Sequence, residues 1–100
     1  MQEAHFERRF YEPPEKARES VSQTKARLND LIGQEGSFIS KEKGIFSLDN
    51  IIYIMSVKED YSGFNRRSYA VLSAEVCAFE NGLDSERFKR IIGEIFDVGS

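Results

Sequence analysis

The sequence carries few side chains of the types that perform nucleophilic catalysis, and they lie far apart along the chain. His5 is its one histidine and Cys77 its one cysteine. Nucleophilic catalysis needs a nucleophile, a base and an orienting group within hydrogen-bond reach of one another. His5 also lies near the N-terminus, where chains are often poorly ordered. The pattern therefore favours a Cys77 that packs in or beside a sheet over a catalytic cysteine.

Patterns typical of metal and phosphate sites are absent. The sequence contains no CxxC, HExxH or EF-hand loop, and the carboxylate pair Glu59-Asp60 is expected to be solvated in a loop. The segment from Gly33 to Gly36 lacks the lysine and Ser/Thr of a P-loop, and it follows a predicted helix, not a strand. We therefore expect no cofactor and no catalytic activity. A small enzyme that uses carboxylates or Cys77 is the alternative.

Aromatic and arginine side chains gather from Tyr61 to Tyr69, in and just after a predicted loop from Lys58 to Arg67. Around its Gly63, five side chains of types that contribute strongly to protein interfaces lie close in sequence: Tyr61, Phe64, Arg66, Arg67 and Tyr69. These five are the candidate partner-binding residues. The same types suit a nucleic-acid site, with Arg66 and Arg67 on phosphates and an aromatic ring under a base. A plain hairpin loop with solvated arginines is the third interpretation.

Length and composition favour a small globular domain. The chain has 100 residues, 40% of them hydrophobic and 31% charged, which fits one domain over residues 1–100. Residues 1–12 lack clear periodicity and are expected to form a flexible arm or a short edge strand. The longest apolar run, Ile51 to Met55, is far shorter than a membrane span, and a single cysteine favours the cytoplasm. The net charge of −3 predicts no broad attraction to nucleic acid or membrane.

A first helix is predicted from Pro14 to Ile32. Proline suits the first turn of a helix, and Gly33 is expected to end it. Apolar and small residues recur every three or four positions and form one stripe: Ala17, Val21, Thr24, Leu28 and Leu31. This stripe is expected to pack on the protein's own sheet. The same spacing also matches a coiled-coil seam, so a homodimer through this helix is the alternative.

A second helix is predicted from Ser85 to Asp97, with Asp84 as its N-cap. A wide apolar face repeats with helical period, and it is expected to cover the sheet: Phe88, Ile91, Ile92, Ile95 and Phe96.

The middle of the chain is typical of strands. Two short strands, Gly36 to Ser40 and Gly44 to Leu48, flank a polar hairpin tip, and Asp49-Asn50 makes a second turn. The strand Ile51 to Val57 is apolar on both alternating faces, which indicates a central strand covered on both sides. Ser68 to Phe79 fits either a strand or a helix, and the strand is favoured because the central strand needs a neighbour for its backbone groups.

The elements combine into an α+β fold. An N-terminal helix is followed by a three- to four-stranded antiparallel meander and a C-terminal helix packed on the sheet. With no catalytic pattern, this architecture favours a small acidic protein-binding module of the immunity, inhibitor, anti-defence, adaptor or chaperone type. Its expected partner is another protein with a basic or mixed-charge surface. Nucleic acid is the weaker alternative, and no membrane partner is expected.

Overall fold

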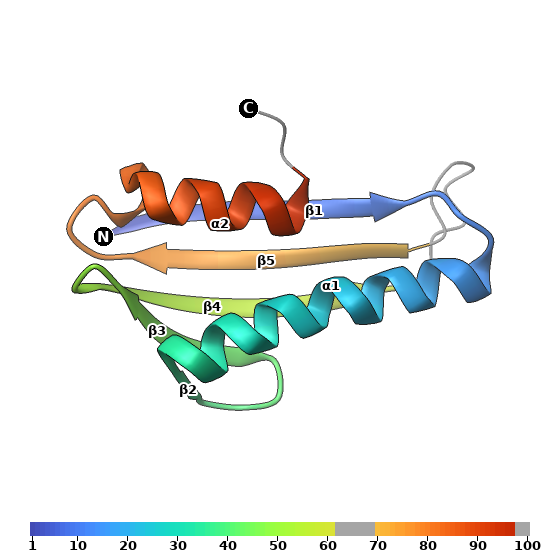
Figure 1. The fold of residues 1–100 in the computed structure, drawn as a ribbon, viewed down its shortest axis with the longest axis horizontal. Helices are drawn as coiled ribbons and strands as arrows, with labels where there is room; N and C mark the ends of the chain where they lie inside the picture. The colour runs from blue at the N-terminus through green and yellow to red at the C-terminus, as the bar shows by residue number, and fades with distance from the viewer. Residues whose placement is uncertain (62–69, 98–100) are drawn as a thin grey trace.

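The computed structural model describes residues 1–61 and 70–97, and these residues form a five-stranded antiparallel sheet with two α-helices (Figure 1). The strands lie in the order β1-β5-β4-β3-β2. The elements follow one another as β1 (Gln2–Phe10), α1 (Pro14–Glu35), β2 (Gly36–Phe38), β3 (Lys43–Leu48), β4 (Ile51–Asp60), β5 (Ala70–Ala78), a 3₁₀ turn (Gly82–Asp84) and α2 (Glu86–Phe96).

The predicted order of elements is wrong at its start. A strand, β1, precedes the first helix and pairs antiparallel with β5, so that Gln2 lies opposite Ala78 and Phe10 opposite Ala70. The sequence allowed a short edge strand here, and the strand that forms has nine residues. Every second side chain of β1 is exposed, while Phe10 is buried. Charged residues lie on both sides of this strand, and they conceal its alternation in the sequence.

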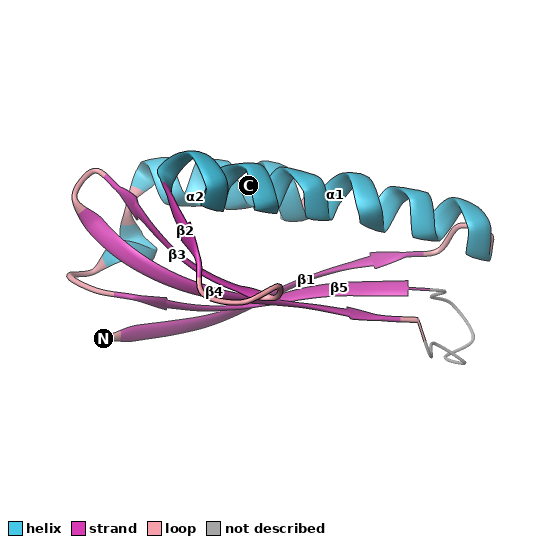
Figure 2. Cartoon of the chain, turned by 90° about the horizontal axis from the view of Figure 1, so that it is seen from below, coloured by secondary structure: helices cyan, strands magenta, loops and turns pink. Residues whose placement is uncertain are grey.

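Both described helices lie on the same face of the sheet (Figure 2). The apolar stripe of α1 is buried there, as the favoured interpretation requires, and its members are Ala17, Val21, Thr24, Leu28, Leu31 and Ile32. A coiled-coil dimer through Pro14 to Ile32 would need these same residues, which are committed to the core. The helix also continues through Gly33 to Glu35. Glycine weakens a helix but does not end it where the backbone keeps its hydrogen bonds, so the predicted stop is wrong.

Helix α2 covers the outer part of the sheet. Its N-cap is Ser85, whose Oγ accepts a hydrogen bond from the Phe88 N–H, and not Asp84, which ends the 3₁₀ turn. Phe88 is stacked on Tyr53 of β4 with ring centroids 4.6 Å apart, and Tyr53 is stacked in turn on Phe46 of β3 at 5.1 Å. The Tyr53 hydroxyl donates to the Gly82 carbonyl at 2.7 Å. This stack joins two strands, the 3₁₀ turn and α2.

The hairpin and strand predictions for the middle of the chain are largely confirmed. Asp49 and Asn50 both have positive φ, 52° and 66°, as a two-residue hairpin turn between antiparallel strands requires. Ala70–Ala78 is a strand, which is the favoured alternative for this segment. β4 runs on to Asp60, so the first residues of the predicted loop belong to the strand.

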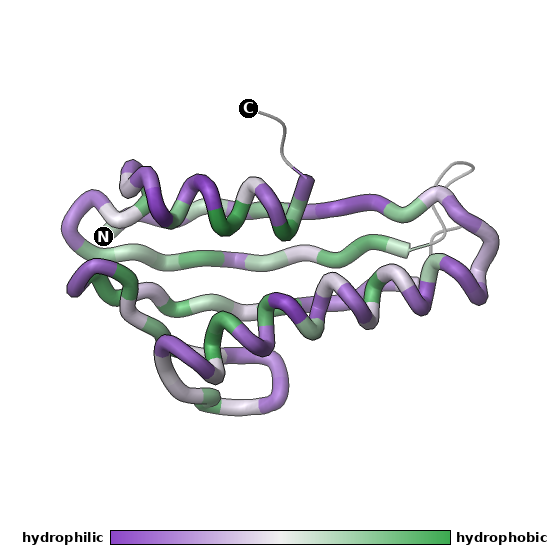
Figure 3. Tube along the Cα trace, in the orientation of Figure 1, coloured by the Kyte–Doolittle hydropathy of each residue, from purple (hydrophilic) through white to green (hydrophobic). Residues whose placement is uncertain are grey.

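β4 lies in the interior of the sheet as predicted, between β3 and β5, but helices cover only one of its faces. Tyr53, Met55 and Val57 are buried under the helices, whereas Ile52 on the other side is 45% exposed. Figure 3 shows hydrophobic residues along most of β5, while much of the outer strand β1 is hydrophilic. Within the described residues, neither helix is both long and apolar enough to cross a membrane.

Candidate functional site on the open face of the sheet

The face of the sheet that the helices leave uncovered carries a group of apolar side chains near one end of its strands. The strand register places Cys77 of β5 beside Ile54 of β4, and Ile54 beside Ile45 of β3. Ile52 lies two residues from Ile54 on the same face, and the Phe79 N–H donates to the Ile52 carbonyl at 3.1 Å. We call Ile45, Ile52, Ile54, Cys77 and Phe79 the apolar patch.

All five side chains of the apolar patch are partly exposed to solvent. Ile52 is 45% exposed and Phe79 39%, and the other three are half-buried by their neighbours on the sheet. Scattered exposed apolar residues are normal on a protein surface, but contiguous ones are typical of interaction sites. The arrangement therefore suits contact with an apolar surface.

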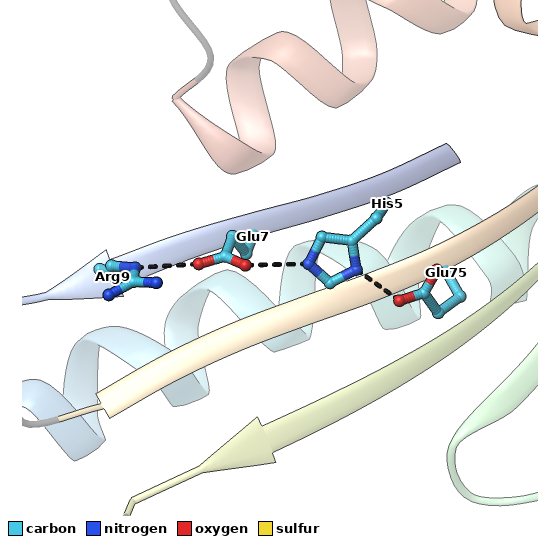
Figure 4. Close-up of polar contacts among 4 residues, drawn as sticks. All are labelled: His5, Glu7, Arg9 and Glu75. Carbon is cyan, nitrogen blue, oxygen red and sulfur yellow. Dashed lines mark hydrogen bonds and ion pairs between the residues drawn. The ribbon is translucent and has the colours of Figure 1, made fainter. Parts of the chain in front are cut away.

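A network of charged side chains lies beside the apolar patch, on β1 and β5 (Figure 4). His5 interacts through Nε2 with Glu7 at 2.9 Å and through Nδ1 with Glu75, which lies directly across the strand pair. Arg9 donates from Nε to the second oxygen of Glu7, also at 2.9 Å. We call His5, Glu7, Arg9 and Glu75 the polar cluster. In the next row of the sheet, the Cys77 thiol contacts a carboxylate oxygen of Glu3 at 3.8 Å.

Electrostatics within the polar cluster favour a protonated histidine. Hydrogen bonds to Glu7 and then to Glu75 raise the pKa of His5 above its usual 6.5. The bonds from His5 and Arg9 lower the pKa of Glu7. A neutral imidazole has a single N–H, so donation to two carboxylates at once requires the cation. The cluster thus behaves as a chain of ion pairs on the sheet surface.

His5 and Cys77 lie far apart along the chain and on different predicted elements, but the structure places them in neighbouring rows of one sheet face. The surroundings nevertheless suit ion pairing more than proton transfer. The side chain of His5 is 47% exposed and that of Glu75 67%, and both ring nitrogens of His5 are already bonded to carboxylates. Over residues 1–61 and 70–97, no three His, Cys, Asp or Glu side chains are placed to hold a metal ion.

The polar cluster predicts a pH-dependent stability. The folded-state pKa of His5 is raised, so its protonation stabilises the folded state. This stabilisation is complete below about pH 6.5 and is lost as pH rises through the higher pKa of the folded state. The lowered pKa of Glu7 means that its own contribution is lost only as pH falls below about 4.5. We expect the free energy of unfolding in urea to decrease as pH rises above about 6.5, and His5→Gln to remove most of that decrease.

A matched variant separates the cluster from general charge effects. Lys16→Gln removes one exposed positive charge on α1, away from the sheet, and should leave the slope of stability against pH unchanged. Identical pH profiles for the wild type and His5→Gln would show that the cluster contributes nothing to the folded state.

Most of the predicted binding loop lies outside the described residues: Phe64, Arg66, Arg67 and Tyr69 belong to residues 62–69. Tyr61 is described, and its side chain contacts β4 and α1. Its hydroxyl donates to Glu59 at 2.9 Å, and the guanidinium of Arg18 lies 5.5 Å from the ring centroid. Glu59 in turn pairs with Lys25 of α1 at 2.6 Å. The nucleic-acid alternative, which depends on Arg66 and Arg67, stays a prediction.

An open groove of about 770 Å³ lies beyond Lys43, the first residue of β3. The last residues of β4 extend past Lys43 at this place. Three lysines and three glutamates line it: Lys25, Lys43, Lys58, Glu42, Glu59 and Glu75. Their charges balance, and Lys25 is already paired with Glu59. The groove therefore offers no net charge to select an anionic or a cationic ligand.

The apolar patch was not among the candidate sites drawn from the sequence, although a signal for it was present. Ile51 to Val57 is apolar on both alternating faces, which indicated cover on both sides. In the structure no described residue covers the face of β4 that carries Ile52 and Ile54, so these apolar side chains lie on the protein surface. Comparison with protein-family models, with curated proteins and with solved structures finds no match.

Proposed function

We propose that this chain is a non-enzymatic protein-binding module, of the immunity, inhibitor or adaptor type, that binds a partner protein through the open face of its sheet. The observation that supports the proposal is the apolar patch on a face without helical cover. Water contact with large apolar side chains costs free energy, and a sheet can avoid it by placing polar residues there, as β1 does. The patch keeps apolar side chains on the inner strands instead.

The charges around the apolar patch define the chemistry of the partner. Glu3 lies at one end of the row that contains Cys77, Ile54 and Ile45, and Glu75 lies in the adjacent row. Lys43 lies across Ser56 from Glu75, at the opposite side of the sheet. The partner that fits is a protein surface with an apolar centre and a basic side chain placed to meet Glu3. We propose that the two meet in the cytoplasm.

The energetics favour a moderate to tight complex. Full burial of an Ile or Phe side chain stabilises by roughly 1.5–3 kcal/mol, and the patch residues are already partly buried by the sheet. A partner would therefore gain about half of that from each, before the cost of association is subtracted. A few such side chains at the centre of an interface are enough to dominate its affinity.

The test is capture of a partner from the native host by the tagged chain, compared between two variants. Ile52→Asp places a charge in the apolar patch. Phe38→Asp is the matched control, because Phe38 is 48% exposed but shares its face with Gly44, on the side of the helices. We expect Ile52→Asp to reduce recovery of a stoichiometric partner at least tenfold and Phe38→Asp to leave recovery unchanged.

Both variants change an exposed residue, so both should keep the cooperative thermal transition of the wild type. Equal recovery with Ile52→Asp and with the wild type would overturn the proposal. So would recovery of no stoichiometric partner by the wild type.

A further inference from the structure

Among the described residues, the outer edge of β1 is a second surface that has no structural neighbour. In the described part of the chain, β1 pairs only with β5, so one side of its nine-residue backbone has no strand beside it. The opposite edge of the sheet is the three-residue β2. A long edge strand presents a row of unpaired N–H and C=O groups that another strand can complete.

The sequence of β1 is complementary to itself in charge when it is reversed about Phe6. In an antiparallel pair of two β1 strands centred on Phe6, Glu3 faces Arg9 and His5 faces Glu7, and each contact occurs twice. These four side chains share the open face of the sheet, where every facing pair would have opposite charge with His5 protonated. On the other face, Phe6 meets Phe6 of the second copy, and Arg8 meets the small Ala4.

We propose that two copies of this chain associate through their β1 edges, antiparallel and centred on Phe6, to form one continuous ten-stranded sheet. Such a contact has two-fold symmetry, as most homodimers have, and it satisfies the backbone groups of both edges together. Cross-strand pairs of opposite charge and of aromatic rings stabilise an antiparallel ladder, whereas like charges destabilise it. The interface lies at the outer edge and leaves Ile45, Ile52 and Ile54 accessible for a partner protein.

Other registers of the same two strands are less favourable. Antiparallel strands that keep both open faces on one side can shift only by an even number of residues. A shift in one direction places Glu3 opposite Glu7 and His5 opposite His5. A shift in the other places Glu7 opposite Glu7 and His5 opposite Arg9. The centred register therefore gives both the longest overlap and the only full set of opposite charges.

Helix α2 lies along β1 on the helix side of the sheet, so the α2 of a second copy would lie directly beside it (Figure 1). Its Ile91 and Ile95 line a hollow with Leu31 of α1, and its Phe88 and Phe96 contact Phe6. At 100° per residue, Gly93 lies on neither of these sides but toward the outer edge of the sheet.

Glycine is a poor helix former, so its place in the middle of α2 calls for a packing reason. In the proposed dimer the two α2 helices meet above the symmetry axis, beside the two Phe6 residues. Gly93 has no side chain to separate the two helices, and Lys89, one turn earlier on the same side of α2, is exposed and long enough to turn aside. The register of the two β1 strands carries the proposal.

The test is sedimentation equilibrium over micromolar to millimolar concentrations, with a charge swap across the interface. We expect a reversible dimer for the wild type. Glu3→Arg alone places two positive charges opposite each other twice per dimer, and should weaken dimerisation at least tenfold. Arg9→Glu alone should do the same. The double variant Glu3→Arg/Arg9→Glu restores opposite charges and should return the dissociation constant to within about threefold of the wild type.

Two further variants complete the design. Glu19→Arg makes the same change of net charge on the exposed side of α1 and should leave the dissociation constant unchanged. Gly93→Leu favours the helix but blocks the close approach, and should weaken dimerisation at least tenfold without unfolding the chain. A wild type that is monomeric at millimolar concentration overturns the inference. A dimer that neither single charge reversal weakens also overturns it.

Discussion

Phe88→Ala should lower the free energy of unfolding by about 3–5 kcal/mol, as truncation of a fully enclosed phenylalanine does. Phe88 is 2% exposed, is stacked on Tyr53 at 4.6 Å and meets Phe6 edge-on at 6.0 Å. Its removal leaves a cavity between α2 and the sheet that no neighbour can fill without moving. Urea unfolding followed by circular dichroism measures the loss.

Phe79→Ala is the matched control for this truncation. Phe79 is 39% exposed and belongs to the apolar patch on the opposite face, so the same change should cost less than about 1 kcal/mol. It should weaken partner binding instead. Equal destabilisation by the two variants would contradict the assignment of one face to the core and the other to the surface.

Gly36→Ala should lower the free energy of unfolding by about 1–3 kcal/mol, the usual cost of forcing an atom into a packed position. A Cβ at Gly36 would lie 1.9 Å from the Ile45 carbonyl oxygen and 2.5 Å from the Phe46 Cα. Both are backbone atoms of β3, so no side chain can rotate to make room. β2 must then separate from β3 at the end of α1.

Gly33→Ala, three residues earlier, should instead raise the free energy of unfolding. Nothing lies within 4 Å of a Cβ at Gly33, and the residue is inside α1. Alanine in a helix interior is about 1 kcal/mol more favourable than glycine, so thermal stability should rise. A lower thermal transition for Gly33→Ala would indicate that the helix ends at Gly33, where the sequence placed its stop.

Periodicity was a sound guide to both helices. The stripe of α1 and the apolar face of α2 repeat with helical period, whereas Ser68 to Phe79 fitted either a strand or a helix and was assigned from the need of the central strand for a neighbour. Asp49 and Asn50 were recognised as a turn because they accept positive φ more readily than other residues with a side chain. Helical periodicity and turn residues act over a few neighbouring positions, so the sequence alone can reveal them.

The parts that the sequence did not reveal depend on long-range contacts. β1 pairs with β5, sixty or more residues later, and no local pattern encodes that partner. Its charged face also resembles a solvated arm. The apolar character of Ile52 and Ile54 cannot by itself show whether a helix, a second sheet or another protein covers them. The site therefore emerged only when the position of both helices was known.

The most direct test of binding through the open face of the sheet is the reaction of Cys77 with Ellman's reagent. The rate is compared between the free chain and its complex with the captured partner. Cys77 is the single cysteine of the chain and lies within the apolar patch, half-buried. The thiol should react in the folded free chain at a rate that does not follow global unfolding, and should be protected at least tenfold by the partner. Equal rates in the free chain and in the complex would contradict binding through the open face of the sheet.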